Sequence, residues 1–185
     1  IRYHYRPLRR ALDLAKANDY IESNPAHGAV PPPPMEPDLG VWSAEEAARF
    51  LWEIRDHWAY SLFATAILTG MRRGEIVGLT WPAVDFQRGR LWVNQTVVYD
   101  GNKIVVQPAP KTKKGRRSVA IGPGLVQILL DHKQEQIRKK RYRNDGWVWP
   151  NRYGGPIDPH NLSGKTFPML IERAGLPRIR FHDLR

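Results

Sequence analysis

The chain contains no cysteine, and this absence excludes disulfide bonds, thiolate catalysis and zinc sites built on cysteine. It also lacks any apolar run near the roughly 18 residues that a membrane-spanning helix needs. Acidic residues are scarce, because 18 Asp and Glu stand against 29 Lys and Arg, and the formal net charge is +11. This surplus favours a polyanionic partner, nucleic acid ahead of an anionic membrane, although a merely basic protein would show it too.

The remaining composition is that of a folded protein. The 185 residues suffice for one full domain and part of another, and 42% of them are hydrophobic, so a core can be buried. The six histidines are scattered, and His182 has no obvious partner ligand, which argues against a metal-dependent nuclease. We therefore expect no metal site and no cofactor.

A proline-rich stretch separates two regions of the chain. Five of the seven residues 31–37 are proline, which favours an extended connector and excludes a helix. Before it, residues 3–21 show an apolar helical face, and Asn24-Pro25 is expected to end that helix. A lone helix cannot bury its own apolar face, so it is expected to be the tail of an incomplete core-binding domain, or alternatively to dock on the main domain. The predicted segments are a tail helix at 1–28, a linker at 29–40 and an incomplete main domain at 41–185.

The main domain is predicted to be mainly helical with one small sheet. Ser43 and Glu46 form a capping box at its first helix. Apolar periodicity predicts helices over 44–54, 58–68, 73–79, 125–142 and 159–174, with one more beginning at 181. Alternating residues predict strands over 91–99, 103–107 and 117–121, with a hairpin turn at 100–102. The expected fold class is α+β, mainly helical, with a three-stranded antiparallel sheet.

Arg72 is the first candidate for chemistry. It follows Gly70 at the junction of two predicted helices, where a side chain can project into a cleft, and arginine suits bidentate capture of phosphate oxygens. Glu75 lies about one helical turn further on and could orient a catalytic neighbour. The competing interpretation is an ordinary surface ion pair between Arg72 and Glu75, which this segment alone favours.

A basic turn supplies the second candidate. Five of the seven residues 111–117 are cationic: Lys111, Lys113, Lys114, Arg116 and Arg117. A lysine near a leaving oxygen can serve as general acid, and Lys111 stands out because it lies at a strand end, where the backbone is best fixed. A solvated hairpin with no catalytic role is the competing interpretation.

His182 and Arg185 form the third candidate. Three residues apart, they would share one face of a helix. A histidine can hold or transfer a proton near neutral pH, and a second arginine would complete a phosphate clamp. The pair alone is common in unrelated proteins, and it gains weight from the order arginine, lysine, His-x-x-Arg along one chain.

Taken together, these motifs resemble those of tyrosine recombinases of the phage integrase type. The family's first arginine motif resembles Thr69-Gly70-Met71-Arg72-Arg73-Gly74-Glu75-Ile76 with 79–85. Its lysine-bearing hairpin resembles Pro110-Lys111-Thr112-Lys113 followed by 117–121, and its second arginine motif resembles 174–176 with Phe181-His182-Asp183-Leu184-Arg185. The resemblance covers residues 41–185, and residues 12–25 resemble the last helix of the family's core-binding domain.

The resemblance implies a role for each candidate. Arg72 and Arg185 would bind the scissile phosphate, and Lys111 would protonate the departing 5′ oxygen. His182 would assist proton transfer and phosphate binding, and Glu75 would support the others. Expected DNA contacts come from the cations Arg73, Lys113, Lys114, Arg116 and Arg117.

The resemblance also implies what the complete protein does. It would be an enzyme for site-specific DNA integration and recombination, encoded by a mobile element, that breaks and rejoins double-stranded DNA at attachment-type sites through a 3′-phosphotyrosine. It would act as a homotetramer in the bacterial cytoplasm, with accessory DNA-bending factors and without a membrane partner. The family's nucleophilic tyrosine follows the second arginine, and none of the seven tyrosines here stands in that context. We therefore expect this chain to bind DNA without cutting it.

Other functions fit the sequence less well. Ser163-Gly164-Lys165-Thr166 resembles half of a phosphate-binding loop, but the first glycine of that motif would fall at Pro159. An RNA-binding module would need a platform of stacked aromatic side chains, which the sequence does not suggest. The serious alternative is a catalytically inactive DNA-binding accessory protein on the same fold.

Overall fold

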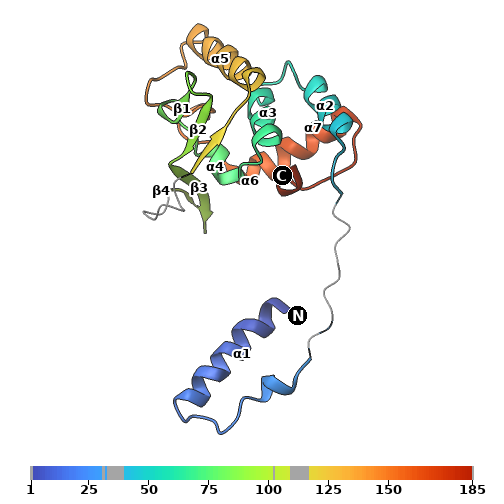
Figure 1. Cartoon of the computed structure of the whole chain (residues 1–185), viewed down its shortest axis with the longest axis vertical. Helices are drawn as coiled ribbons and strands as arrows, with labels where there is room; N and C mark the ends of the chain where they lie inside the picture. The colour runs from blue at the N-terminus through green and yellow to red at the C-terminus, as the bar shows by residue number, and fades with distance from the viewer. Residues whose placement is uncertain (1, 31, 33–39, 102, 109–116, 185) are drawn as a thin grey trace. The chain divides into compact units, whose positions relative to one another are not determined.

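The computed structural model describes residues 2–30, 32, 40–101, 103–108 and 117–184. The chain forms two compact units, residues 1–38 and 39–185, and their boundary falls inside the predicted linker (Figure 1). The helices are α1 (Arg2–Ala17), α2 (Ala44–Glu53), α3 (Tyr60–Thr69), α4 (Arg73–Val77), α5 (Pro123–Arg138), α6 (Pro159–Asn161) and α7 (Phe167–Ala174). Shorter 3₁₀ segments are η1 (Pro25–Gly28), η2 (Trp81–Ala83) and η4 (Phe181–Leu184), and η3 (Leu162–Thr166) is a π-helical turn. The strands are β1 (Val84–Asp85), β2 (Arg90–Val93), β3 (Gln95–Asp100), β4 (Lys103–Pro108) and β5 (Arg117–Ala120).

The first unit is α1 with the segment that folds back onto it. The hydroxyl of Tyr5 donates to the carbonyls of Ala26 and Ala29, at 2.8 and 3.1 Å. Asn24 Nδ2 donates to Asp13 Oδ1 at 2.7 Å and so holds η1 against the C-terminal half of α1. Leu8 and Leu14 remain 56% and 58% exposed, so this unit leaves part of its apolar surface uncovered. Its assignment to a core-binding domain stays a prediction.

The end of α1 differs from the prediction. The helix ends at Ala17, and Asp19 adopts a left-handed conformation with φ of 57°. Asn18 Nδ2 donates to the carbonyl of Leu14 at 2.8 Å, which satisfies one of the last helical carbonyls. Asn24 does not end the helix as predicted, and instead caps η1 by accepting a hydrogen bond from the amide of Ala26.

The core of the second unit centres on α3, which is apolar on nearly all sides and contacts α2, α4 and α5. An aromatic cluster joins it to α2 and α7, because the ring of Phe63 lies 5.4 Å from Phe50 and 5.2 Å from Phe167. The predicted capping box at α2 is confirmed, with Ser43 and Glu46 each donating a backbone N–H to the other's side chain. Through these contacts, α2, α3 and α7 pack against one another.

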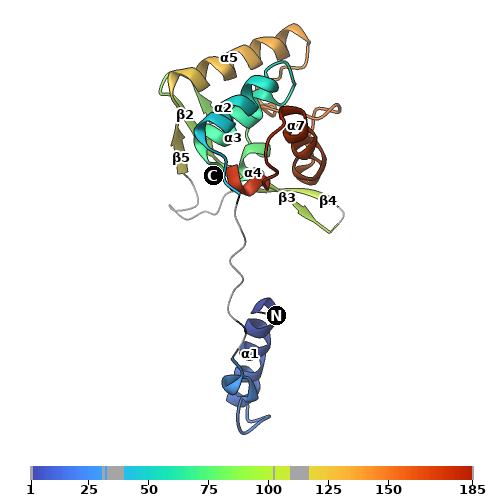
Figure 2. The ribbon, with the colours of Figure 1, turned by 90° about the vertical axis from the view of Figure 1, so that its right-hand side faces the viewer.

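The strands form two sheets instead of one. A three-stranded antiparallel sheet has the order β1-β2-β5, and β3 pairs only with β4 in a separate hairpin. The hairpin projects away from β2 and β5 in both ribbon views (Figure 2). The predicted fold class, mainly helical α+β with a small three-stranded antiparallel sheet, is confirmed. Its strand composition was predicted wrongly, because β1 had not been expected and the hairpin does not join the sheet.

The strand predicted over 91–99 is interrupted at Asn94, and the reason lies in α4. A Cβ atom at Gly74 would stand 2.6 Å from the carbonyl oxygen of Val97, and one at Gly78 would stand 3.0 Å from that of Gln95. Two glycines therefore let β3 pack directly on α4, and Gln95 Nε2 adds a hydrogen bond to the carbonyl of Gly78 at 2.9 Å. This close approach turns β3 away from the sheet that contains β2.

Candidate active site

Arg72 stands at the N-terminus of α4, immediately after the turn that ends α3. Gly70 ends α3 with a left-handed φ of 58°, which changes the direction of the chain. Met71, the next residue, is buried and anchors the turn that precedes Arg72. The backbone of Arg72 is extended and its side chain is 61% exposed. The guanidinium therefore reaches a solvent-accessible surface.

Glu75 anchors this arginine from one turn further along α4. Its side chain is only 7% exposed, and it accepts hydrogen bonds from the backbone N of Arg72 at 2.7 Å and from Arg72 Nη1 at 3.1 Å. Burial alone would raise the pKa of Glu75. Hydrogen bonds from Arg117, then from Arg72, outweigh burial and hold the pKa below its ordinary value, so the carboxylate is ionised at neutral pH.

Arg117 is the second partner of Glu75. It begins β5, and its Nη1 and Nη2 each donate to one carboxylate oxygen of Glu75, both at 2.7 Å. This is the parallel, two-bond geometry that arginine forms best with a carboxylate. Arg117 had been grouped with the DNA-contacting cations, but the structure directs its guanidinium toward an acid.

His182 lies in η4, at the other end of the second unit's sequence. The preceding residue, Phe181, is buried and its ring lies 5.7 Å from that of Phe167 and 5.9 Å from that of Phe63. Phe181 therefore anchors η4 in the aromatic core and leaves His182 exposed at the surface. The structure places this histidine on a short 3₁₀ turn, where the sequence had suggested the start of an α-helix.

Asp183 closes the same turn. It accepts hydrogen bonds from the backbone N, Nε and Nη2 of Arg180, at 3.0, 2.8 and 2.7 Å. The side-chain hydrogen bonds of Arg180 are the main reason that the pKa of Asp183 is lowered. This pair was missed in the sequence, although opposite charges three residues apart are a signal that could have revealed it.

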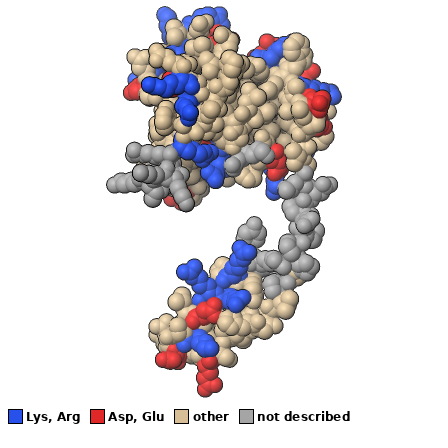
Figure 3. Space-filling view, viewed as in Figure 1, with Lys and Arg blue, Asp and Glu red and all other residues tan. Residues whose placement is uncertain are grey.

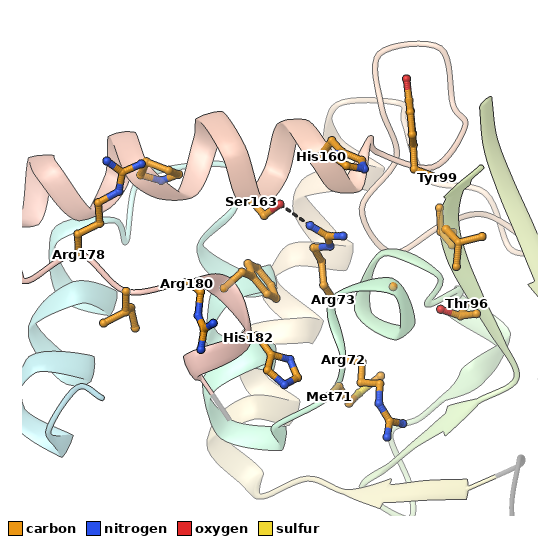
Figure 4. Close-up of a pocket in the computed structure, with 16 residues that line it drawn as sticks. Met71, Arg72, Arg73, Thr96, Tyr99, His160, Ser163, Arg178, Arg180 and His182 are labelled. Atoms are coloured by element: carbon orange, nitrogen blue, oxygen red, sulfur yellow. Dashed lines mark hydrogen bonds between the residues drawn. The ribbon is translucent and has the colours of Figure 1, made fainter. Parts of the chain in front are cut away.

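Arg72 and His182 line one cavity of about 730 Å³. Figure 4 shows both side chains among the lining residues, Arg72 from the start of α4 and His182 from η4. The wall also contains Arg178, which had no predicted role. A cavity with several cationic side chains from separate elements can hold an anionic group such as a phosphodiester.

Arg73 lines the same cavity, and its side chain is held by a residue of η3. Its Nη1 donates to the Oγ of Ser163 in η3 (Figure 4), and Ser163 in turn donates to the carbonyl of Pro159 at 3.0 Å. The bond joins α4 to the helical segment that precedes η4. The predicted contact of Arg73 with DNA stays a prediction.

Five predicted site residues lie outside the described part of the chain: Lys111, Lys113, Lys114, Arg116 and Arg185. Of the predicted catalytic set, the structure therefore brings together Arg72, Glu75 and His182. The two parts of the cavity wall that carry Arg72 and His182 are the start of α4 and η4, which lie far apart in the second unit's sequence.

Surface charge does not by itself mark the site. Figure 3 shows Lys and Arg side chains at several places on this face of the second unit, including its upper and lower edges. Within the described residues, no group of three or more His, Asp or Glu side chains is placed to hold a metal ion. The described helices also include none that is long and apolar enough to cross a membrane.

Comparison with known families identifies the family of this chain. Residues 43–185 match the model of the phage integrase family, and the chain belongs to that family. It is 30% identical over 200 residues to a protein described as tyrosine recombinase XerC-like from Caldanaerobacter subterraneus, a match that covers 96% of this chain and 51% of that protein. The chain thus spans about half the length of the curated relatives it matches.

Among the solved structures that share the fold are two integrases. One is the Tn1549 transposon integrase in complex with transposon right end DNA, with a TM-score of 0.80, 21% identity, and coverage of 100% of this chain and 63% of that one. The other is a lambda integrase tetramer bound to a Holliday junction, with a TM-score of 0.66, 18% identity, and coverage of 97% and 50%. At these identities the likeness shows the fold alone.

Proposed function

We propose that the protein containing this chain is a site-specific tyrosine recombinase, an integrase that cleaves and rejoins DNA through a 3′-phosphotyrosine intermediate. The observation that supports it most is the meeting of Arg72 and His182 in one cavity, from two motifs far apart in the sequence. Membership of the phage integrase family adds to it.

In this proposal the site works by binding charge at fixed positions. Arg72, and Arg185 with it, holds the non-bridging oxygens of the scissile phosphate, where negative charge gathers in the transition state. A tyrosine hydroxyl attacks phosphorus and gives up its proton, and His182 assists that transfer. The 5′ oxygen leaves and takes up a proton that Lys111 supplies. The phosphotyrosine conserves the phosphodiester bond energy, so the 5′ hydroxyl can attack it in the reverse step and rejoin the strand without ATP.

The nucleophile is proposed to lie in the part of the protein that follows Arg185. Among the tyrosines of this chain, Tyr99 lines the cavity, and its ring packs against His160 at 4.6 Å. It lies on β3, before the His-x-x-Arg motif, and so does not fit the order of the family's motifs.

The test uses the full-length protein and a nicked duplex that carries a candidate attachment site. We expect an SDS-resistant protein–DNA adduct, and we expect Arg72→Ala to slow its formation by about 10²–10³-fold, the typical cost of removing one oxyanion donor. Tyr99→Phe should still form the adduct. If Tyr99→Phe abolishes it instead, the nucleophile lies within this chain and the proposed position is wrong.

The inactive accessory protein is the outcome to be separated from this one. Tight, salt-sensitive binding to the site with no adduct from the full-length protein would support the accessory function and overturn the enzyme. The family match and the relatives described as recombinases and integrases favour the enzyme over this alternative.

We further propose that the complete protein acts as a homotetramer on double-stranded attachment-type sites, in the bacterial cytoplasm and with accessory DNA-bending factors. Similarity to an integrase solved as a tetramer on a Holliday junction supports the oligomer. Size measurements on the full-length protein with paired half-sites would check it, and a monomer on paired sites would contradict it.

A further inference from the structure

We propose that Arg117 is a positioning residue, which holds Glu75 and through it Arg72, and that it does not contact DNA. This inference rests on the proposed function, because its effect is on the arginine that would bind the scissile phosphate. It departs from the expectation that Arg117 contacts DNA together with Lys113, Lys114 and Arg116.

The contacts of Glu75 support it first. This carboxylate is 7% exposed and receives four hydrogen bonds, two from Arg117 and two from Arg72. The two bonds from Arg117 are each 2.7 Å long, shorter than the 3.1 Å bond from Arg72 Nη1. Arg117 is therefore the stronger side-chain partner of Glu75. Because Glu75 also binds the backbone and the guanidinium of Arg72, its position determines the position of Arg72.

The position of Arg117 in the sheet supports it next. Arg117 pairs with Val93 in the antiparallel register of β5 and β2, and Val93 is buried. Its backbone is thus held by the sheet while its side chain reaches α4. A chain of contacts runs from the sheet through Glu75 to both the backbone and the guanidinium of Arg72.

Charge and exposure point the same way. Arg117 and Arg72 share one carboxylate, so their combined charge with Glu75 is a single positive charge. The side chain of Arg72 is 61% exposed and that of Arg117 is 38% exposed. The Arg72 guanidinium therefore remains accessible to a phosphate, whereas both terminal nitrogens of Arg117 donate to Glu75.

Arg117 also connects Glu75 to the lysine-bearing turn. It follows Lys111 closely, at the start of the strand that succeeds the basic turn. The ion pair with Glu75 therefore links β5, the strand after Lys111, to α4, the helix that follows Arg72. Glu75 would thus position both the arginine motif around Arg72 and the strand that follows Lys111.

The experiment uses the full-length protein with five variants: Arg117→Gln, Arg117→Lys, Glu75→Gln, the double variant Arg117→Gln with Glu75→Gln, and Arg90→Gln. Arg90 is the matched control, an exposed arginine on the neighbouring strand β2 that donates to Ser118 Oγ. Two quantities are measured for each. They are the salt dependence of DNA affinity, and the single-turnover rate of adduct formation on nicked DNA at saturating protein.

We expect Arg117→Gln to keep the affinity and its salt slope but to lose on the order of 10²-fold in rate, the scale of a misplaced catalytic group. Arg117→Lys should recover part of the rate, since lysine keeps the charge but not the paired geometry. The double variant should be no slower than Glu75→Gln alone, because both changes break the same chain of contacts. Arg90→Gln should match the wild type.

Several results would overturn the inference. A salt slope reduced by about 0.9 in Arg117→Gln would make Arg117 a phosphate contact. Rate losses that multiply in the double variant would mean that Arg117 does not act through Glu75. If Arg117→Gln fails to fold, Arg117→Lys decides, and a wild-type rate in that variant would contradict positioning. A wild-type protein that forms no adduct overturns the proposed function and this inference together, whereas a normal wild type with a fully active Arg117→Gln overturns this inference alone.

Discussion

Asp183 binds Arg180 through three hydrogen bonds, one from the backbone N and two from the guanidinium. The pair encloses the first turn of η4, where His182 faces the cavity. The side chain of Asp183 is 9% exposed, so the acid is largely sheltered while Arg180 remains open. The backbone at His182 is thus held from both sides, by the buried ring of Phe181 before it and by the bonds of Asp183 after it.

Removing the charge of Asp183 should therefore loosen His182 without weakening DNA binding. We expect Asp183→Asn to reduce the rate of adduct formation by about 10-fold, less than the loss of a direct contact, with unchanged DNA affinity. Asp85→Asn is the matched control, because Asp85 accepts from the backbone N and Nη1 of Arg88 in the same three-residue spacing, away from the cavity-lining residues. Equal rate losses in the two variants would show that the Arg180–Asp183 pair has no special effect on the site.

Acidification should destabilise the fold through Glu75. Its pKa is lowered in the folded state, so the ionised carboxylate contributes stability above the ordinary carboxyl pKa, and this contribution is lost as the pH falls through the folded-state value. We expect Glu75→Gln to lower the free energy of unfolding by about 1–3 kcal/mol at neutral pH and to flatten its decline between about pH 6 and pH 3. Urea unfolding across this range measures both. The exposed Glu172→Gln should keep the wild-type slope, and a wild-type slope in Glu75→Gln would contradict the prediction.

The basic turn should dominate the salt dependence of DNA binding. If Lys113 and Lys114 each contact one phosphate, replacing both with glutamine should make the log–log slope of affinity against salt shallower by about 1.8. Fluorescence anisotropy over a salt series measures the slope. Lys133→Gln is the control, since the Nζ of Lys133 lies 4.9 Å from the centre of the Tyr142 ring and is engaged within the fold. Equal slopes for the double variant and the wild type would show that Lys113 and Lys114 do not contact DNA phosphates.

Gly74 should be intolerant of any side chain. A Cβ atom there would meet Val97 O at 2.6 Å, so Gly74→Ala must push β3 away from α4. We expect a loss of about 1–3 kcal/mol in the free energy of unfolding, measured by chemical denaturation. Gly124→Ala is the control, because nothing lies within 4 Å of its Cβ position in α5, and it should be neutral or stabilising by up to about 1 kcal/mol. A stable Gly74→Ala would show that α4 and β3 can separate without cost.

The helices were predicted well where local signals agree. The capping box of Ser43 and Glu46 marks the start of α2, and the apolar run before Gly70 marks α3. The end of α1 was missed because Asn18 and Asp19 terminate it well before Asn24, the residue that had been taken as its end. Two adjacent residues that favour left-handed and capped conformations were the local signal that the prediction overlooked.

The sheet shows where local patterns are insufficient. Alternation in 91–99 identifies extended chain, but it does not say which strands pair, because pairing depends on what covers each face. Here the missing side chains of Gly74 and Gly78 allow β3 to pack closely on α4. The strand β5 pairs with β2 instead of β4. The partner of a strand was therefore decided by a helix outside the sheet.

By itself, the sequence determined the chemistry that the chain carries: a surplus of cations, an arginine motif with its acid, a lysine segment and a His-x-x-Arg pair in order. It also determined most helices, since their periodicity and caps are local. Only the tertiary structure decided that Arg72 and His182 share a cavity and that Arg117 turns to Glu75 instead of outward. These relationships join residues from separate elements, and they depend on burial and on close packing around α4, which no local pattern records.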